Sequence, residues 1–220
     1  MATHLPPVHR SVRTGGWLIL VGAVQFVVAM IVVQADYPGY SLLTNYISDL
    51  GNTVLSPAHL VFNLSIMALG LLAFGGILLA WGAFPGRSLR LTGLGLLLLA
   101  SVAAIFVGIF PENVNAGYHG LASLLVFLPG GLGLLAIGAA MSEPSHWGWL
   151  RAPSIVLGLV TLVSLAVFLF TSFGASQYPG LVERLVVYPI LLWAVLAGAQ
   201  LVRLPIRARA MHHLVPGAAP

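Results

Sequence analysis

The sequence has no cysteine and no lysine among its 220 residues, and few charged residues of any kind. Without cysteine, the chain can form no disulfide, no thiolate metal site and no cysteine nucleophile. Without lysine, Schiff-base chemistry is excluded. No GxxxxGK[ST] motif is present and no GxGxxG follows a strand, which disfavours nucleotide cofactors, and no HxxxH or HExxH spacing supports a metal site. The chemistries that remain depend on histidine, serine, carboxylates and arginine.

Only 6% of the residues are charged, whereas 59% are hydrophobic and the mean hydropathy is +1.01. A water-soluble fold could not cover its surface with polar groups at this composition, so the sequence predicts a membrane protein. Its apolar runs are much longer than the strands of about ten residues that form membrane β-barrels. Since each segment must satisfy its own backbone hydrogen bonds within the hydrocarbon, we expect an all-α integral membrane fold.

Six apolar segments are long enough to cross a bilayer, for which a helix needs about 20 residues. We therefore predict a six-transmembrane-helix bundle over residues 16–202, preceded by a cytoplasmic N-terminal segment (residues 1–15) and followed by a cytoplasmic tail (residues 203–220) that is first basic and then disordered. We expect the first span to be an uncleaved helix rather than a signal peptide. The predicted spans are residues 16–33, 57–81, 91–110, 118–141, 153–173 and 185–202.

Eight of the nine arginines fall on one side of these spans, and Arg184 alone falls on the other. The positive-inside rule places the arginine-rich side, and therefore both termini, in the cytoplasm. The aromatic residues agree, because four of the five tryptophans fall at that interface and all six tyrosines fall at or near the opposite one. The sequence thus predicts a multi-pass protein of the cell (inner) membrane.

The longest connection, about residues 34–56, carries the polar run NYISDLGN, residues 45–52, at the predicted outer surface. Three spans begin at the same surface with polar residues four positions apart, which share one helix face. Their helix N-termini bring unpaired N–H groups and partial positive charge to one level, which favours an anionic group. If the spans pack as one bundle, we expect the polar side chains to surround a single outward-opening cavity. The three pairs are His59 with Asn63, His119 with Ser123, and Arg184 with Tyr188.

The polar loop also has a purely structural interpretation. Residues 49–52 favour an Asx turn with Gly51 in the left-handed conformation. Ser56 and Pro57 favour a helix N-cap followed by proline at the first helical position. Histidine rings sit readily at a membrane interface without a ligand. These interpretations stay open beside the functional one.

Few polar residues lie within the spans. Gln25 and Trp193 do, and we expect them to pack or hydrogen-bond between helices rather than to belong to a site. Acidic residues inside the spans, which would mark an ion or proton pathway, are missing. This absence disfavours a pump or a secondary transporter.

The polar loop and the helix starts resemble prokaryotic membrane proteins of the domain-of-unknown-function 998 family, through the blocks YISDLGN, SPAHLVFNLSIMALGLLA, GIFPENVNAGYHGLASLLVF and VERLVVYPILLW. The first block is also similar to the eukaryotic DRAM/Sfk/GPI-remodelling superfamily, which carries an Ile-Ser-Asp-x-Gly loop. The resemblance implies a six-span bundle linked to lipids, because eukaryotic members affect GPI-lipid remodelling, phosphoinositide metabolism and autophagy. The chain departs from the eukaryotic pattern at residues 52–55 and at Arg184, where Trp is usual. The positions that match are Asn45, Ile47, Ser48, Asp49, Gly51, Pro57, Phe62, Asn63, His119, Ala122 and Glu183.

From these observations we expect an outward-facing polar pocket that binds a lipid or lipid-linked headgroup, with hydrolysis or transfer of an acyl or phosphate-containing group as an open extension. In that scheme Asp49 orients or charges the base His119, Ser48 or Ser123 is the nucleophile, and Glu183 with Arg184 positions an anionic group. The candidate substrate-binding residues are Asn45, Ser48, His59, Asn63, Glu112, Asn113, Ser123, Glu183, Arg184 and Tyr188.

Two other function classes stay open. A non-catalytic scaffold or accessory subunit would use the loop only for its conformation and would dock a partner membrane subunit, or a second copy of the chain, on its small-residue helix faces. A small-molecule transporter would need a water-filled path through the bundle. Membrane lipids are the expected partners and nucleic acids are not, because the arginines lie at span ends. The sequence indicates no particular cofactor or metal.

Overall fold

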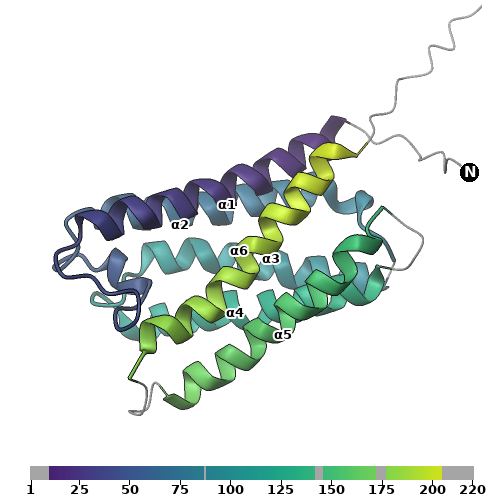
Figure 1. The fold of residues 1–220 in the computed structure, drawn as a ribbon. Helices are drawn as coiled ribbons and strands as arrows, with labels where there is room; N and C mark the ends of the chain where they lie inside the picture. The colour runs from purple at the N-terminus through teal and green to yellow at the C-terminus, as the bar shows by residue number, and fades with distance from the viewer. Residues whose placement is uncertain (1–9, 87, 142–145, 172–176, 205–220) are drawn as a thin grey trace, which may run out of the picture.

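Six long helices make up most of the computed structural model, which describes residues 10–86, 88–141, 146–171 and 177–204 (Figure 1). No strand occurs within those ranges. Two short 3-10 helices, η1 (Ser48–Gly51) and η2 (Trp81–Ala83), lie in connections. The long helices are α1 (Arg10–Asp36), α2 (His59–Ala80), α3 (Ser88–Ile109), α4 (Ala116–Ala140), α5 (Gly148–Thr171) and α6 (Pro179–Arg203).

Each of the six helices is long and apolar enough to cross a membrane, which confirms the predicted all-α six-helix fold and makes the chain a multi-pass membrane protein. The largest differences from the predicted spans are earlier starts. α6 begins at Pro179, six residues before the predicted start, because proline suits the first turn of a helix. The predicted tail beyond Leu204, residues 1–9 and the last residues of the predicted fifth span lie outside the described residues.

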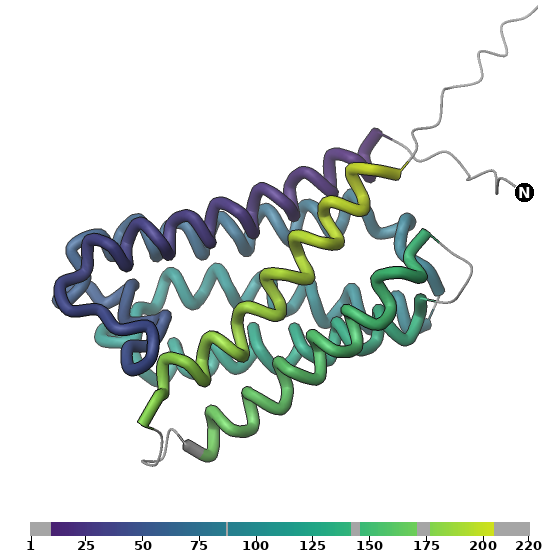
Figure 2. The backbone as a smooth tube through the Cα atoms, in the orientation of Figure 1, coloured from purple at the N-terminus to yellow at the C-terminus, as the bar shows by residue number. Residues whose placement is uncertain are grey.

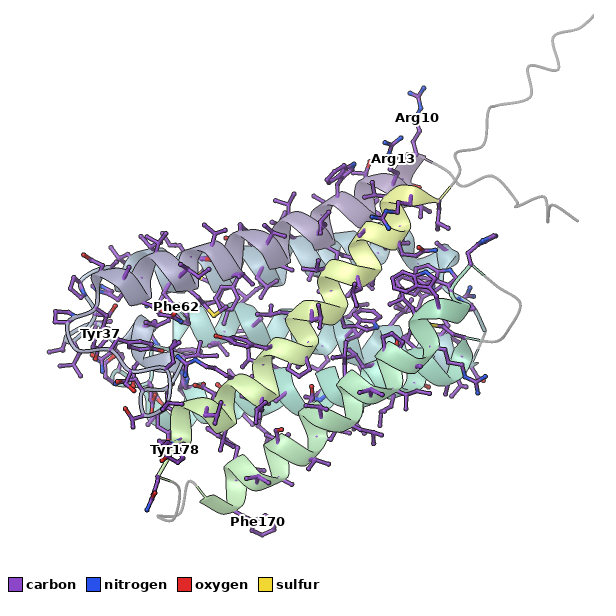
Figure 3. All side chains as sticks on the ribbon, viewed as in Figure 1. Arg10, Arg13, Tyr37, Phe62, Phe170 and Tyr178 are labelled. Carbon is purple, nitrogen blue, oxygen red and sulfur yellow. The ribbon has the colours of Figure 1, made fainter. Side chains whose placement is uncertain are left out.

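The helices form a ring in chain order, in which each packs against the next and α6 packs against α1 (Figure 2). The start of α1 and the end of α6 meet at one end, called here the terminal end, where Figure 3 shows Arg10 and Arg13. The opposite end, where Tyr37 lies, is called the loop end. Side chains fill the interior of this ring as two clusters of buried residues.

α1 and α6 are in close contact only near the terminal end. A Cβ added to Gly16 would lie 2.9 Å from the carbonyl oxygen of Gly198, and a Cβ on Gly198 would lie 2.9 Å from that of Gly16. Towards the loop end the two helices diverge (Figure 1). Residues of the first connection fill the gap, where Tyr40 and Asn45 contact Arg184 of α6. The connection is thus part of the helix bundle.

The buried side chains form one cluster in each half of the bundle. In the terminal half, Phe84 stacks on Trp147 with ring centroids 4.7 Å apart and also faces Trp193. In the loop half, Phe26 and Phe62 meet with centroids 5.5 Å apart, and Figure 3 shows Phe62 inside the bundle. The interior is therefore apolar in both halves of the bundle.

Polar groups inside the spans pair between helices, as predicted for Gln25 and Trp193. Gln25 donates through Nε2 to the carbonyl oxygen of Ser65 (2.9 Å) and accepts from the Ser65 hydroxyl (2.9 Å), joining α1 to α2. Trp193 donates through its indole nitrogen to the hydroxyl of Ser154 (2.8 Å), joining α6 to α5. These bonds satisfy groups that hydrocarbon could not solvate.

Candidate functional site

The connection from Tyr37 to η1 is held together by its own polar side chains. The Asp49 carboxylate accepts hydrogen bonds from the backbone N–H of Tyr46 (2.9 Å) and from the Asn45 amide (3.1 Å). The Asn45 side-chain oxygen in turn accepts from the backbone N–H of Ser41 (3.0 Å). These contacts fix the turn that leads into η1, whose Leu50 is completely buried. Asp49 and Asn45 therefore determine the path of the loop.

Gly51 is needed for close packing, and the predicted left-handed conformation is wrong. The glycines with positive φ among the described residues are Gly39 and Gly86. A Cβ on Gly51 would overlap the side-chain oxygen of Asn63 and would lie 3.0 Å from the ring of Phe62. The Asn63 amide also donates to the Gly51 carbonyl oxygen (3.1 Å). Asn63 thus anchors η1 to α2.

α2 begins two residues after the proline that was predicted to open it. Its first residue is His59, and its N-cap residue, Ala58, makes no side-chain capping bond, so the predicted cap at Ser56 is wrong. Pro57 and Ala58 form a turn before the helix, and this turn separates Ser56 from the first helical N–H groups. The Ser56 carbonyl oxygen instead faces both the backbone N–H (3.2 Å) and the ring Nδ1 (2.9 Å) of His59. The His59 ring is therefore engaged locally.

Arg184 is 4% exposed and fastens the loop to α6. Its Nη1 donates to the carbonyl oxygens of Asn45 (2.9 Å) and Gly180 (2.8 Å), and its Nη2 donates to the Tyr40 hydroxyl (2.6 Å). The Tyr40 hydroxyl in turn donates a hydrogen bond to the carbonyl oxygen of Tyr46 (2.7 Å). Sequence reasoning missed Tyr40. The available signal was that a buried guanidinium needs acceptors and that tyrosines cluster in the same connection.

The phenol of Tyr40 keeps its proton over a wide pH range. Burial raises the pKa of Tyr40 to about 12, although the charge of Arg184 and its hydrogen bond oppose the rise. Burial, and to a lesser extent the Asp49 charge, also raises the pKa of Tyr37. The protonated phenol can donate to Tyr46 while it accepts from Arg184. The hydrogen bonds that join Arg184, Tyr40 and Tyr46 therefore require the neutral form of Tyr40.

Two acidic residues approach η1 from other parts of the ring. Glu183 of α6 is 6% exposed, and its carboxyl accepts a hydrogen bond from the backbone N–H of Ile47. Glu112, in the connection between α3 and α4, accepts a hydrogen bond from the Ser48 hydroxyl (2.8 Å). The start of η1 is thus tied to both sides of the ring, and the two carboxyls are brought to the same region.

His119 of α4 is 8% exposed, and its Nδ1 lies 2.8 Å from the carbonyl oxygen of Phe110. A carbonyl only accepts, so Nδ1 carries a proton, and in the neutral ring Nε2 is an acceptor. The partner of Nδ1 is thus a backbone carbonyl, where the sequence analysis expected Asp49, whose carboxylate is engaged within the loop. The assignment of His119 and Asp49 as catalytic residues stays a prediction.

Two adjoining cavities meet at the loop end. The inner chamber, of about 70 Å³, lies within the ring and is lined mostly by apolar side chains such as Phe26, Phe62 and Ile66. The outer cavity, of about 360 Å³, lies between α4, α5 and α6 beneath the loop and also includes Glu112. The residues that line both spaces are Ser48, His119, Ser123, Phe127 and Glu183.

The packing of α4 on α5 explains where the outer cavity lies. A Cβ on Gly158 would lie 2.9 Å from the carbonyl oxygen of Gly131, so the two helices touch in the middle of the bundle. Nearer the loop end both helices line the cavity instead, α5 with larger side chains. Gly120 and Leu169, which line it, are also exposed on the sides of α4 and α5. The outer cavity therefore reaches the apolar outer surface of the bundle.

The structure brings together five of the predicted site residues around this cavity and leaves the others elsewhere. Asn113 pairs with Thr53 at the exposed rim (2.8 and 3.1 Å). Tyr188 lines a separate groove between α1 and α6. Asn45, Asp49, His59, Asn63 and Arg184 hold the loop and the helix ends. The five that line the outer cavity are Ser48, Glu112, His119, Ser123 and Glu183.

The apolar lining of the inner chamber was not predicted, because its residues have the same character as any helix core in this sequence.

Among the described residues, no group of three or more histidine and acidic side chains is arranged to hold a metal ion.

Comparison with known protein families matches residues 20–200 to the family described as "Protein of unknown function (DUF998)". No curated protein and no solved structure matches the chain. The family match covers all but the first part of α1 and the last turn of α6, and so includes every residue of the two cavities. The chain therefore belongs to the DUF998 family of membrane proteins.

Proposed function

We propose that the outer cavity binds the polar headgroup of a membrane lipid or of a lipid-linked molecule. The observation that carries this proposal is the shared wall of Ser48, His119, Ser123 and Glu183 between two cavities, one of which opens on the apolar side of the bundle. The sixth span begins at Pro179, so it contains Glu183, and the expectation that the spans hold no acidic residue is wrong. Ionisable residues within a spanning segment are costly and generally mark a functional site. A lipid matches this arrangement, because its headgroup can contact the polar wall while its acyl chains lie against the apolar outside of the bundle.

The route of the lipid follows from the residues at the cavity mouth. Leu169 is 44% exposed and lines the cavity. The acyl chains of a lipid can therefore lie against α5 in the hydrocarbon while the headgroup of the same lipid enters between α4 and α5. The inner chamber is too small for a whole acyl chain, but its walls of Phe26, Phe62 and Ile66 can accept a short apolar portion. Apolar burial and polar contacts then act on one ligand.

We further propose that the loop end faces the outside of the cell membrane. Arg10, Arg13 and Arg203 lie at the terminal end, as do Arg90 in the first turn of α3 and Arg151 in the first turn of α5. Arg184 is the arginine at the loop end among the described residues. This distribution supports cytoplasmic termini by the positive-inside rule.

Hydrolysis or transfer of a lipid-linked group is the second candidate, and the state of His119 favours it. His119 lines both cavities, its neutral ring with Nδ1 protonated has Nε2 as an acceptor, and Ser123 lies one helical turn further along α4 on the same wall. A general base and a hydroxyl nucleophile need this kind of proximity. Ser48 is the other hydroxyl, and its hydrogen bond to Glu112 supplies a second acceptor for its proton.

Ser123→Leu tests the binding proposal, because the larger side chain fills the wall that both cavities share. We expect the purified variant to retain less lipid than the unmodified protein, measured by native mass spectrometry and by lipid quantification. Gly95→Leu is the matched control, since a Cβ at Gly95 meets open space. Equal lipid retention in both variants would contradict binding in the cavity and would favour the scaffold interpretation.

His119→Asn tests the reaction, because an amide at this position can still donate to the Phe110 carbonyl but cannot act as a base. We expect product release from membrane lipids, followed by mass spectrometry, to stop in the variant while lipid retention continues. If the unmodified protein releases no product from any lipid of its own membrane, the protein is a binder and the reaction is rejected.

A further inference from the structure

We infer that the headgroup recognised in the outer cavity carries a primary ammonium, held by Glu112, Glu183 and His119. The inference rests on the proposed function and specifies its ligand. It also reverses the expectation from the sequence, in which Glu183 and Arg184 would position an anionic group.

The charged groups that line the outer cavity are acidic. Glu112 and Glu183 line it, whereas Arg184 is absent from its lining and its guanidinium is bound to Asn45, Gly180 and Tyr40. Among the described residues, the cavity therefore offers two carboxyls and no arginine. Such a site favours a cationic group over a phosphate as the part of the headgroup that lies beside the carboxyls.

Glu183 is the stronger of the two acidic determinants because it is 94% buried. A buried acidic group is costly unless it is paired and hydrogen-bonded. In the described part of the chain its hydrogen-bond partner is the neutral backbone N–H of Ile47. The charge of Arg184 acts on Glu183, but the guanidinium gives its hydrogen bonds to the loop and not to this carboxyl. A cationic ligand would supply the compensating charge.

His119 is an independent indication of a donor ligand. It is 92% buried, and its Nδ1 is occupied by the Phe110 carbonyl. His119 lines both cavities, and in the neutral ring its Nε2 is an acceptor, for which the described residues provide no hydrogen-bond donor. A primary ammonium has three N–H donors, which equals the number of acceptor groups presented by Glu112, Glu183 and His119. A quaternary ammonium has no donor for them.

The test uses a methylation series of one lipid in nanodiscs. Phosphatidylethanolamine and its N-methyl and N,N-dimethyl derivatives, together with phosphatidylcholine, share phosphate, chains and net charge but lose one N–H donor at each step. We expect retention by the purified protein to fall along the series, by about tenfold for each lost charge-assisted hydrogen bond. Phosphatidylglycerol tests whether the cavity prefers an anionic headgroup, and a neutral glycosyl diacylglycerol tests whether it prefers a headgroup of hydroxyl groups.

Glu183→Gln and Glu112→Gln keep an acceptor oxygen but remove the charge, so each is expected to lower the preference for phosphatidylethanolamine over phosphatidylcholine by about tenfold. Asp36→Asn is the matched control, because Asp36 is an acidic residue at the same end of the bundle and lies outside the lining of the cavity. Its preference should equal that of the unmodified protein.

The outcomes separate this inference from the proposed function. Equal retention along the series, or better retention of phosphatidylglycerol or of the glycosyl lipid, would refute the inference that the headgroup carries a primary ammonium. In that case Ser123→Leu would still abolish binding if the cavity is a lipid site. If Ser123→Leu leaves the retention of every lipid unchanged, the lipid site itself is rejected.

Discussion

Arg184 shows how one buried side chain fixes the position of a whole loop. Its guanidinium reaches the backbone at Asn45 and Gly180 and the hydroxyl of Tyr40, so the loop and α6 are joined through one planar group. The same contacts occupy its N–H donors, and Arg184 lines neither of the two cavities. A residue that looked like an anion-binding group in the sequence therefore has a structural role in the loop.

Arg184→Lys should destabilise the protein despite conserving the charge. A lysine ammonium is a compact point donor and cannot span the three acceptors that the guanidinium reaches. We expect the free energy of unfolding to fall by about 2–4 kcal/mol, measured by thermal or denaturant unfolding in detergent. Arg203→Lys, at an exposed position, is the control and should change it by less than about 0.5 kcal/mol. Equal stability of the two variants would mean that the hydrogen bonds of Arg184 do not hold the loop in place.

The raised pKa of Tyr40 sets the direction of a pH effect. The folded protein holds this proton up to about pH 12, whereas an unfolded tyrosine loses it near its ordinary pKa of 10.0. Stability from Tyr40 is therefore fully present below pH 10 and is lost as the pH rises towards 12. We expect unfolding temperatures to decline in that window, and Tyr40→Phe should show a shallower decline. Identical profiles would contradict a shifted pKa.

At the scale of elements, η1 and the start of α2 form one packed unit. Leu50 is fully buried, Asn63 donates to the Gly51 carbonyl, and Phe62 lies against the same glycine. The Ser48 hydroxyl, which lines both cavities, belongs to this unit. The geometry of the cavity wall therefore depends on how closely η1 approaches α2.

Gly51→Ala should push η1 away from α2, because the new Cβ would overlap the Asn63 side chain. Overpacking of this kind costs about 1–3 kcal/mol. We expect a lower unfolding temperature together with weaker lipid retention, since Ser48 moves with η1. Gly95→Ala is the control. Its Cβ meets open space within a helix, so it should stabilise by about 0.5–1 kcal/mol. A Gly51→Ala protein as stable as the Gly95→Ala protein would refute the packing argument.

At the scale of the whole molecule, the ring of helices gives the protein two unlike ends. The terminal end carries Arg10, Arg13 and Arg203 and an aromatic core around Phe84, whereas the loop end carries both cavities. Even numbers of spans bring both termini to one side. The orientation of the bundle therefore decides whether the cavities are reached from outside the cell.

The absence of cysteine makes that orientation simple to measure. Val54→Cys places a thiol at an 81% exposed position at the loop end, and Gly82→Cys places one at an exposed position at the terminal end. With an impermeant maleimide on intact cells, we expect labelling of Val54→Cys alone, because the positive-inside rule favours a cytoplasmic location for the arginine-rich terminal end. Gly82→Cys should react only after permeabilisation. The opposite pattern would invert the proposed orientation.

The sequence by itself determined the membrane class, the number of helices and which residues are too polar to face lipid. These follow from composition and from the length of apolar runs, which are local properties, and the structure confirms the first two. Local patterns also misled, since the turn at residues 49–52 and the cap at Ser56 were assigned from residue preferences alone. Tertiary packing places Gly51 against Asn63 and starts α2 at His59 instead.

Only the tertiary structure decided which polar residues meet. Arg184 and Glu183 are neighbours in sequence and both are buried, yet one binds the loop and the other lines the cavity. Their directions depend on helix rotation and on the divergence of α1 and α6, which no local pattern specifies. The same rotation leaves Tyr188 in a separate groove and brings His119 to the wall between the two cavities. Composition therefore determined that there is a polar end, and the packing of the ring determined its chemistry.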